Sequence, residues 1–304
     1  MYLRGETMGT YYTLQYWSEE RVSAHEIDGD VQALLDQFEN ELSNWREDSW
    51  VNQFNHAGAG EVIPMPDVAF QVVSLSLDLA EKSDGLLDPT AGPLIELWGF
   101  GTDRNVEIPS QSSIDQISSQ VGYDKLKLDP VERTLQKSVT GVQLNCSAVA
   151  KGFAVDLIAE RLAANGIENH LINIGGEVKA EGTHLDSEPW KVGIRQPVFQ
   201  GRVGKTLRSI ELHNQALATS GHSQRSFEKD GKRYSHILNP KTGHPVPLVT
   251  ASATVMAPTC ALADGLATLA LILNETQMTE LTESFRNIEV HRTSWAIDDF
   301  ARRN

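Results

Sequence analysis

Residues 258–273 read Pro-Thr-Cys-Ala-Leu-Ala-Asp-Gly-Leu-Ala-Thr-Leu-Ala-Leu-Ile-Leu, and this segment sets how the rest of the chain packs. Thr259 follows a proline and suits the N-cap position of a helix. The residues after it are almost all small or apolar. A helix that is apolar on every side is normally buried, so the segment predicts a helix in the core.

Asp264 is the acidic residue of this segment, and Thr268 follows it by one helical turn. That spacing places both side chains on one face of the helix. A buried carboxylate is too costly to leave unpaired, so Asp264 needs either a Lys or Arg partner or a metal ion. Carboxylate and hydroxyl oxygens suit a hard ion such as Mg²⁺. The plain alternative has Thr268 bonding back to its own helix, and the segment alone leaves both readings open.

The composition is that of an ordinary soluble globular protein, with 304 residues of which 40% are hydrophobic and 22% charged. This length allows one elaborate domain or two closely joined halves. The formal net charge of −15 argues against nucleic acid as a partner and against docking on anionic lipid. A phosphorylated ligand stays possible, because local backbone amides and one metal ion can overcome a distant negative field.

The compartment is left open by the sequence. Cys146 and Cys260, the two cysteines, lie among small apolar residues and predict buried free thiols. The first residues show no secretory leader, and no apolar run is long enough to span a membrane. These features fit a cytosolic protein, or a mature exported form without its leader.

Strand and helix patterns alternate along the chain. Strands are predicted at 7–17, 126–139 (as a hairpin), 142–144 and 170–180, and helices at 27–42, 68–80 and 147–164. Ser147 is the expected N-cap of the third helix, whose N-terminal amides would form an anion site. The order strand–helix–strand over 142–179 resembles a βαβ unit, but the fingerprint G-x-G-x-x-G is absent. A Rossmann-type dinucleotide site is therefore excluded as the main hypothesis.

Several single residues have both a structural and a functional interpretation. Trp45 just after a helix is either a core lid or a stacking platform, and unaided we favour the lid. The segment 83–94 holds two prolines and two glycines and predicts a fixed loop of the kind that positions ligands or makes a tight crossing. Lys151 is placed either to bind a phosphate group or to extend into solvent. His236 has either a structural role or a role as a general base.

Eight short motifs occur in a fixed order along nearly the whole chain. They are Met8-Gly9-Thr10; Leu42-Ser43-x-Trp45 with Asp48-Ser49 and Phe54-Asn55; Asp88-Pro89-Thr90-x-Gly92-Pro93-Leu94 with Trp98-Gly99-Phe100-Gly101; Ser147-Ala148-x-Ala150-Lys151-Gly152-Phe153; Asn173-x-Gly175-Gly176; Thr219-Ser220-Gly221; His236-Ile237-Leu238-Asn239-Pro240-x-Thr242-Gly243; and Ala263-Asp264-x-x-x-Thr268. Each motif is weak alone. Together they resemble the FAD:protein FMN transferases, the ApbE family of flavin transferases.

The resemblance implies a reaction, in which the FAD pyrophosphate is cleaved, FMN is transferred to a Thr or Ser hydroxyl of an acceptor protein, and AMP is released. It implies Mg²⁺ held by the Asp264 and Thr268 side chains and the Ala148 carbonyl. It also implies a catalytic role for Asp264, and for His236 as the group that eases deprotonation of the acceptor hydroxyl. The positions that match FAD contacts in the family are Met8, Trp45, Leu86, Leu87, Asp88, Asn145, Lys151 and Ile237.

Two positions depart from the family pattern. Asn145 stands where many members have Asp, so the charge is lost while the hydrogen-bonding capacity remains. Ala267 stands where some members have an acid, which leaves Asp264 as the one expected carboxylate ligand. Metal affinity is then expected to be weaker than in those relatives.

The resemblance also implies an architecture and a setting. We expect a single α+β domain over 1–304, with mixed, mostly antiparallel sheets flanked by helices and a ligand cleft between two intertwined halves. Expected acceptors include subunits of sodium-pumping NADH:quinone oxidoreductase or of Rnf-type electron-transport complexes. The expected location is the bacterial periplasm, as an inner-membrane lipoprotein whose leader is absent from this sequence.

Two alternatives remain open at this point. A Mg²⁺-dependent FAD pyrophosphatase would use the same site with water in place of the hydroxyl, giving FMN and AMP. A flavin-binding protein would hold FAD without chemistry, and the lost charge at Asn145 is its one argument. Function belongs to sites rather than folds, so the arrangement of these residues has to decide.

Overall fold

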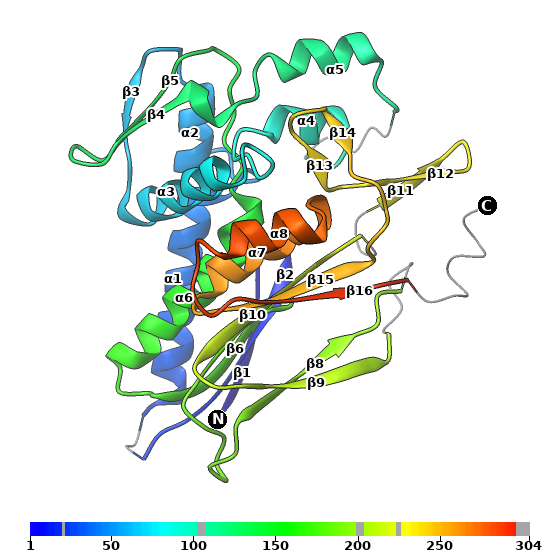
Figure 1. The fold of residues 1–304 in the computed structure, drawn as a ribbon. Coiled ribbons are helices and arrows are strands. Elements are labelled where there is room, and N and C mark those ends of the chain that lie inside the picture. The colour runs from blue at the N-terminus through cyan, green and yellow to red at the C-terminus, as the bar shows by residue number, and fades with distance from the viewer. Residues whose placement is uncertain (20–21, 102–106, 199–203, 223–225, 296–304) are drawn as a thin grey trace.

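A computed structural model describes residues 1–19, 22–101, 107–198, 204–222 and 226–295. Its centre is a seven-stranded sheet in the order β1-β2-β6-β7-β10-β15-β16, in which each described pairing is antiparallel (Figure 1). The strands are β1 (Tyr2–Thr7), β2 (Thr10–Trp17), β6 (Asn169–Ile174), β7 (Glu177–Glu181), β10 (Gln215–Gly221), β15 (Ser252–Ala257) and β16 (Glu289–Thr293). The predicted α+β class with mostly antiparallel sheets is confirmed.

Helices cover one face of this sheet and a hairpin covers the other (Figure 1). The helices are α1 (Ala24–Leu42), α2 (Trp50–His56), α3 (Asp67–Lys82), α4 (Gly92–Leu97), α5 (Gln111–Ser118), α6 (Ser147–Ala164), α7 (Cys260–Ile272) and α8 (Glu275–Thr282), with a 3₁₀ turn η1 (Tyr123–Lys125). The hairpin is β8 (Trp190–Arg195) with β9 (Thr206–Leu212). The smaller sheets are β3 (Val62–Pro64) with β5 (Thr134–Lys137) and β4 (Leu126–Asp129); β11 (Ser226–Lys229) with β12 (Lys232–Ser235); and β13 (Leu238–Asn239) with β14 (His244–Pro245).

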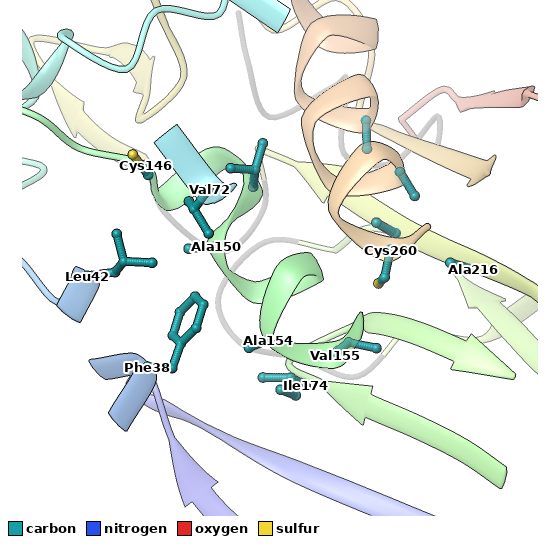
Figure 2. Packing of buried hydrophobic residues seen from close by; sticks show 14 of the residues in the cluster. Phe38, Leu42, Val72, Cys146, Ala150, Ala154, Val155, Ile174, Ala216 and Cys260 are labelled. Carbon is teal, nitrogen blue, oxygen red and sulfur yellow. The ribbon is translucent and has the colours of Figure 1, made fainter. Parts of the chain in front are cut away.

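The main core lies between the sheet and helices α1, α3, α6 and α7. Figure 2 shows side chains from these helices and from the sheet meeting there, among them Phe38, Val72, Ala154, Ile174 and Cys260. The predicted helix over 258–273 is confirmed as α7, and Thr259 caps it by accepting from the amide of Leu262. No helix within the described residues has the length and apolar character needed to cross a bilayer.

Helices α6 and α7 approach each other so closely that one position must be glycine. A Cβ atom at Gly152 would lie 2.3 Å from the carbonyl oxygen of Cys260 and 2.8 Å from the Cα of Ala261. Both neighbours are backbone atoms of α7, which cannot move aside as the end of a flexible side chain can. Gly152 therefore permits the helix contact on which the core is built.

Three local predictions are wrong. Residues 142–144 are not a strand, since the backbone N–H and C=O of Leu144 bond to the Asn55 side chain. Ser147 is the first residue of α6 and not its N-cap. The predicted strand 170–180 is divided at Gly175-Gly176, which form the turn between antiparallel β6 and β7 with φ of 64° and 121°. Because residues 142–144 are not a strand, the predicted βαβ unit does not form. The single domain over 1–304 and the cleft between two halves stay predictions.

We predict that Gly152→Ala lowers the free energy of unfolding by about 1–3 kcal/mol or more, because the new methyl group overpacks the α6–α7 contact. The control is Gly29→Ala in α1, where a Cβ meets no atom within 4 Å. There alanine should stabilise by about 0.5–1 kcal/mol through helix propensity. Urea unfolding of both variants measures the difference, and equal effects would contradict the close contact.

Candidate active site

Asp264 lies in the middle of α7 and is 2% exposed. Its Oδ2 accepts a hydrogen bond from the backbone N–H of Gly152, 3.0 Å away, and its Oδ1 lies 3.6 Å from Nζ of Lys151. Both partners belong to the second turn of α6. The Gly152 contact therefore serves the site directly, because the absence of a side chain lets the α6 backbone reach the carboxylate.

Glu177 completes this cluster from the first position of β7. Its Oε1 lies 2.8 Å from Nζ of Lys151, so the ammonium of Lys151 sits between two acids. Glu177 is 3% exposed, and its Oε2 has no hydrogen-bond partner. The sequence analysis missed Glu177, although its position directly after the Gly175-Gly176 turn was a signal for it.

When both carboxylates are ionised, the single ammonium leaves one negative charge uncompensated in the interior. Burial raises the pKa of Asp264 to about 7; Lys151 opposes the rise and Glu177 adds to it. Burial alone would lower the pKa of Lys151, but Asp264 and Glu177 outweigh it and raise that pKa above its usual value. Lys151 therefore stays charged and cannot neutralise both acids.

A second carboxylate, Asp156 of α6, fixes the start of α7. Its Oδ1 and Oδ2 accept from the backbone N–H groups of Cys260 and Ala261, both at 2.9 Å, and Lys179 pairs with it at 3.2 Å. The first amides of a helix have no partner within that helix, and a carboxylate there also complements the helix dipole. The contact sets α7 in register with α6. Local sequence around Asp156 gave no indication of it.

Thr268 is half-buried one turn after Asp264, as the spacing predicts, and its Oγ1 lies 3.1 Å from Oγ of Ser220 in β10. The described hydrogen bond of the Thr268 hydroxyl is therefore with strand β10 and not with the backbone of its own helix. Ala148 occupies the first turn of α6 and is half-buried. The three predicted metal-ligand residues therefore come from the two helices that Gly152 joins.

Asn145 lies just before α6 and connects it to the segment 86–92. Its N–H donates to the carbonyl of Pro89 at 2.7 Å, and its Oδ1 accepts from the N–H of Ser147 at 3.1 Å. The Asn145 side chain thus satisfies one of the free N–H groups at the start of α6. From the sequence, Ser147 was expected to do this as the N-cap. Leu144 before it is held by Asn55 and also accepts from the Asn44 side chain at 2.8 Å.

The predicted contact stretch 86–88 lies close to these elements. A Cβ at Gly265 would meet Leu87 at 3.9 Å, which places this stretch against α7. The Asp88 carboxylate accepts from the N–H and hydroxyl of Thr90 and from the N–H of Tyr123. Burial raises the pKa of Asp88, against the effect of these bonds. Its side chain holds the loop, and its predicted contact with FAD stays a prediction.

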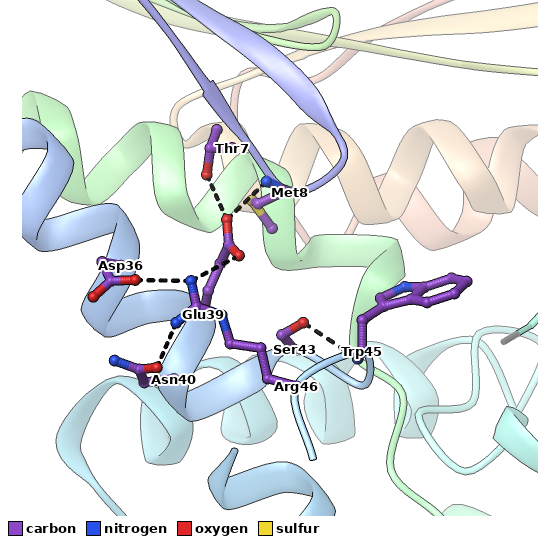
Figure 3. Close-up of polar contacts among 8 residues, drawn as sticks. All are labelled: Thr7, Met8, Asp36, Glu39, Asn40, Ser43, Trp45 and Arg46. Atoms are coloured by element: carbon purple, nitrogen blue, oxygen red, sulfur yellow. Dashed lines mark hydrogen bonds and ion pairs between the residues drawn. The ribbon is translucent and has the colours of Figure 1, made fainter. Parts of the chain in front are cut away.

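Trp45 is 59% exposed, so the lid interpretation is wrong: a core lid would be covered, and this indole faces solvent. The N–H of Met8, in the β1–β2 turn, donates to Glu39 at 2.8 Å (Figure 3). His236 contacts Phe100 edge-on, with 6.3 Å between ring centroids, and Ile237 is buried in the main core. Their predicted roles toward FAD and the acceptor are not tested by these contacts.

The cluster fits a divalent cation of the hard type. Its excess negative charge and the unbonded Oε2 of Glu177 are what a cation would compensate. Within the residues that the structure describes, no group of three or more His, Cys, Asp and Glu side chains is arranged for a metal ion. A site with one carboxylate, one hydroxyl and one backbone carbonyl is compatible with this result. Mg²⁺ commonly takes few protein ligands and completes its shell with phosphates and water.

Comparison with known proteins identifies the family. The model of the ApbE family matches residues 8–291. The chain belongs to the ApbE family. It is 33% identical to the FAD:protein FMN transferase of Haemophilus influenzae over 95% of this chain and 85% of that protein. It is also 33% identical to the enzyme of the same name from Vibrio cholerae, over 90% of this chain and 82% of the relative.

Solved structures agree in fold. The flavin transferase ApbE from Vibrio cholerae superposes with a TM-score of 0.87 at 32% identity, covering 98% of this chain and 94% of that one. The apo form of the Pseudomonas stutzeri flavinyl transferase ApbE gives 0.84 at 35% identity, covering 96% and 94%. The ApbE-like architecture expected from the motifs is confirmed.

The two departures from the family pattern have clear structural settings. The Asn145 side-chain oxygen accepts from the N–H of Ser147, the first residue of α6, and a carboxylate oxygen could accept the same bond. Ala267 is fully buried in the main core, so the α7 face at that position is packed against hydrophobic side chains.

We predict that Mg²⁺ stabilises the wild-type chain and that Asp264→Ala removes this effect. At a hundredfold excess over its Kd, a ligand of the native state adds about 2.7 kcal/mol to the free energy of unfolding. Thermal melts with and without Mg²⁺ measure it. Asp186→Ala, at an exposed position in a loop, is the matched control and should respond to Mg²⁺ as wild type does. An unchanged Mg²⁺ response in Asp264→Ala would show that the metal assignment is wrong.

Proposed function

We propose that this ApbE family member catalyses the Mg²⁺-dependent transfer of FMN from FAD to a Thr or Ser hydroxyl of an acceptor protein, with release of AMP. The relatives named FAD:protein FMN transferase, matched over most of both chains, support the reaction class. The observation that carries the proposal is the buried Asp264 cluster at the α6–α7 contact. The cluster contacts the second turn of α6, one turn after the N-terminal amide groups of that helix, which favour phosphate.

The reaction is a phosphoryl-type transfer. The acceptor oxygen bonds to the phosphorus of the FMN half, the pyrophosphate P–O bond breaks, and AMP leaves with the bridging oxygen. The hydroxyl proton passes to a base, for which His236 is our candidate. Such a reaction depends on positioning and on neutralising phosphate charge, with little covalent work for the protein.

Each part of the site has a role in this scheme. Asp264, Thr268 and the Ala148 carbonyl would hold Mg²⁺, which neutralises charge on the pyrophosphate oxygens when bound. Lys151, kept charged by Asp264 and Glu177, would bind a phosphate oxygen. Trp45 would stack on an aromatic ring of FAD, because a large exposed indole offers a flat surface. Met8, Asn145, Ile237 and residues 86–88 would line the rest of the ligand.

We further propose the setting that the family resemblance suggests. The acceptors would be flavinylated subunits such as those of sodium-pumping NADH:quinone oxidoreductase or Rnf-type complexes. The protein would act in the bacterial periplasm, anchored as a lipoprotein of the inner membrane. Cell fractionation of the source organism tests the location.

The direct test incubates the protein with FAD, Mg²⁺ and an acceptor domain from a sodium-pumping NADH:quinone oxidoreductase subunit. We predict covalent flavin on the acceptor by in-gel fluorescence and by mass spectrometry, together with AMP. Asp264→Ala should form no adduct, and Asp186→Ala should match wild type. AMP release at a comparable rate without acceptor would indicate a pyrophosphatase, and FAD that stays unchanged would contradict both enzymes.

A further inference from the structure

Glu39, near the end of α1, joins two segments that are far apart in the sequence. Its Oε1 accepts from the N–H of Met8 at 2.8 Å and from the hydroxyl of Thr7 at 2.9 Å. Its Oε2 accepts from the guanidinium of Arg46 at 3.3 Å (Figure 3). One carboxylate therefore ties the β1–β2 turn to the loop that follows α1.

The β1–β2 turn needs such an anchor. Met8 has φ of 50° and Gly9 has φ of 70°, the two-residue arrangement that joins strands with right-handed twist. The left-handed region is unfavourable for a side chain like that of methionine, so surrounding contacts have to maintain it. A charged acceptor on the Met8 N–H is a strong contact of this kind.

The loop with Trp45 is fixed on both sides of the indole. Arg46 bonds Asp36 at 2.7 Å as well as Glu39, and the Asn52 side chain donates to the carbonyls of Asn44 and Arg46 at 3.1 and 2.8 Å. The N–H of Trp45 donates to Oγ of Ser43 at 3.3 Å. The backbone is therefore held while the indole stays exposed. Binding to a surface fixed in advance costs little further ordering entropy.

We propose that Glu39 is a positioning residue for the flavin substrate, one that sets the affinity for FAD by holding the Met8 turn and the Trp45 loop in one arrangement. The inference rests on the proposed function, because it takes Met8 and Trp45 as FAD contacts. Glu39 acts through these two residues: the described contacts of its carboxylate are with Thr7, Met8 and Arg46. Without it, the turn and the loop would sample other arrangements and FAD would bind only to a fraction of the molecules.

The test measures the Kd of FAD by flavin fluorescence titration of the full chain, with acceptor and Mg²⁺ left out. Glu39→Ala should raise this Kd about tenfold, the value expected when a tenth of the molecules hold the binding arrangement. Glu39→Gln keeps one acceptor oxygen for Met8 and should fall between Glu39→Ala and wild type. Asp186→Ala is the control, since Asp186 is an exposed loop carboxylate with no described contact to the β1–β2 turn or to the Trp45 loop. Its Kd should stay within about twofold of wild type, as for an ordinary surface substitution.

Kinetics separate positioning from a general loss of structure. In the transfer assay, Glu39→Ala should raise KM for FAD with kcat within about twofold of wild type, the pattern of a lost contribution to binding alone. Its melting temperature should stay close to that of Asp186→Ala. An unchanged Kd in Glu39→Ala, an equal effect of Asp186→Ala, or a fall in kcat at constant KM would overturn the inference. Wild-type protein that binds no FAD would contradict the proposed function itself, and this inference with it.

Discussion

The contact between α6 and α7 at Gly152 is the constraint on which the rest of the structure depends. Only a residue without a side chain lets the α6 backbone approach the Cys260 carbonyl. The same approach brings the Gly152 N–H to Asp264 and the Asp156 carboxylate to the first amides of α7. The same α6–α7 contact therefore supports both the packing of the core and the geometry of the site. A substitution that disturbs this contact should affect stability and activity together.

The electrostatics of the site follow from this packing. A carboxylate in the middle of an apolar helix is costly to bury, and Lys151 offsets that cost only in part because it also serves Glu177. In the proposed function, a cation bound at this cluster would offset the uncompensated negative charge and would in turn attract phosphate oxygens. The overall net charge of −15 does not prevent this, since a local charge acts over a few ångströms while distant charges are screened.

The sequence predicted what depends on local pattern or on collinear motifs. Helix α7, its Thr259 cap, the shared face of Asp264 and Thr268, and the ApbE-like fold are all of this kind. It missed what depends on residues brought together by folding. Asp156 looks like an ordinary helix residue, and Leu144 looks like a strand position until Asn55 binds its backbone. Trp45 was misjudged for the same reason, because its exposure is set by the loop that holds it.

The central claim is that Asp264, Thr268 and the Ala148 carbonyl form one metal site at the α6–α7 contact. The most direct measurement is a crystal structure of the protein soaked with Mn²⁺ in place of Mg²⁺, with anomalous scattering used to locate the ion. The account predicts an anomalous peak in coordination distance of Asp264 and Thr268. A well-occupied peak elsewhere, with none between α6 and α7, would contradict it.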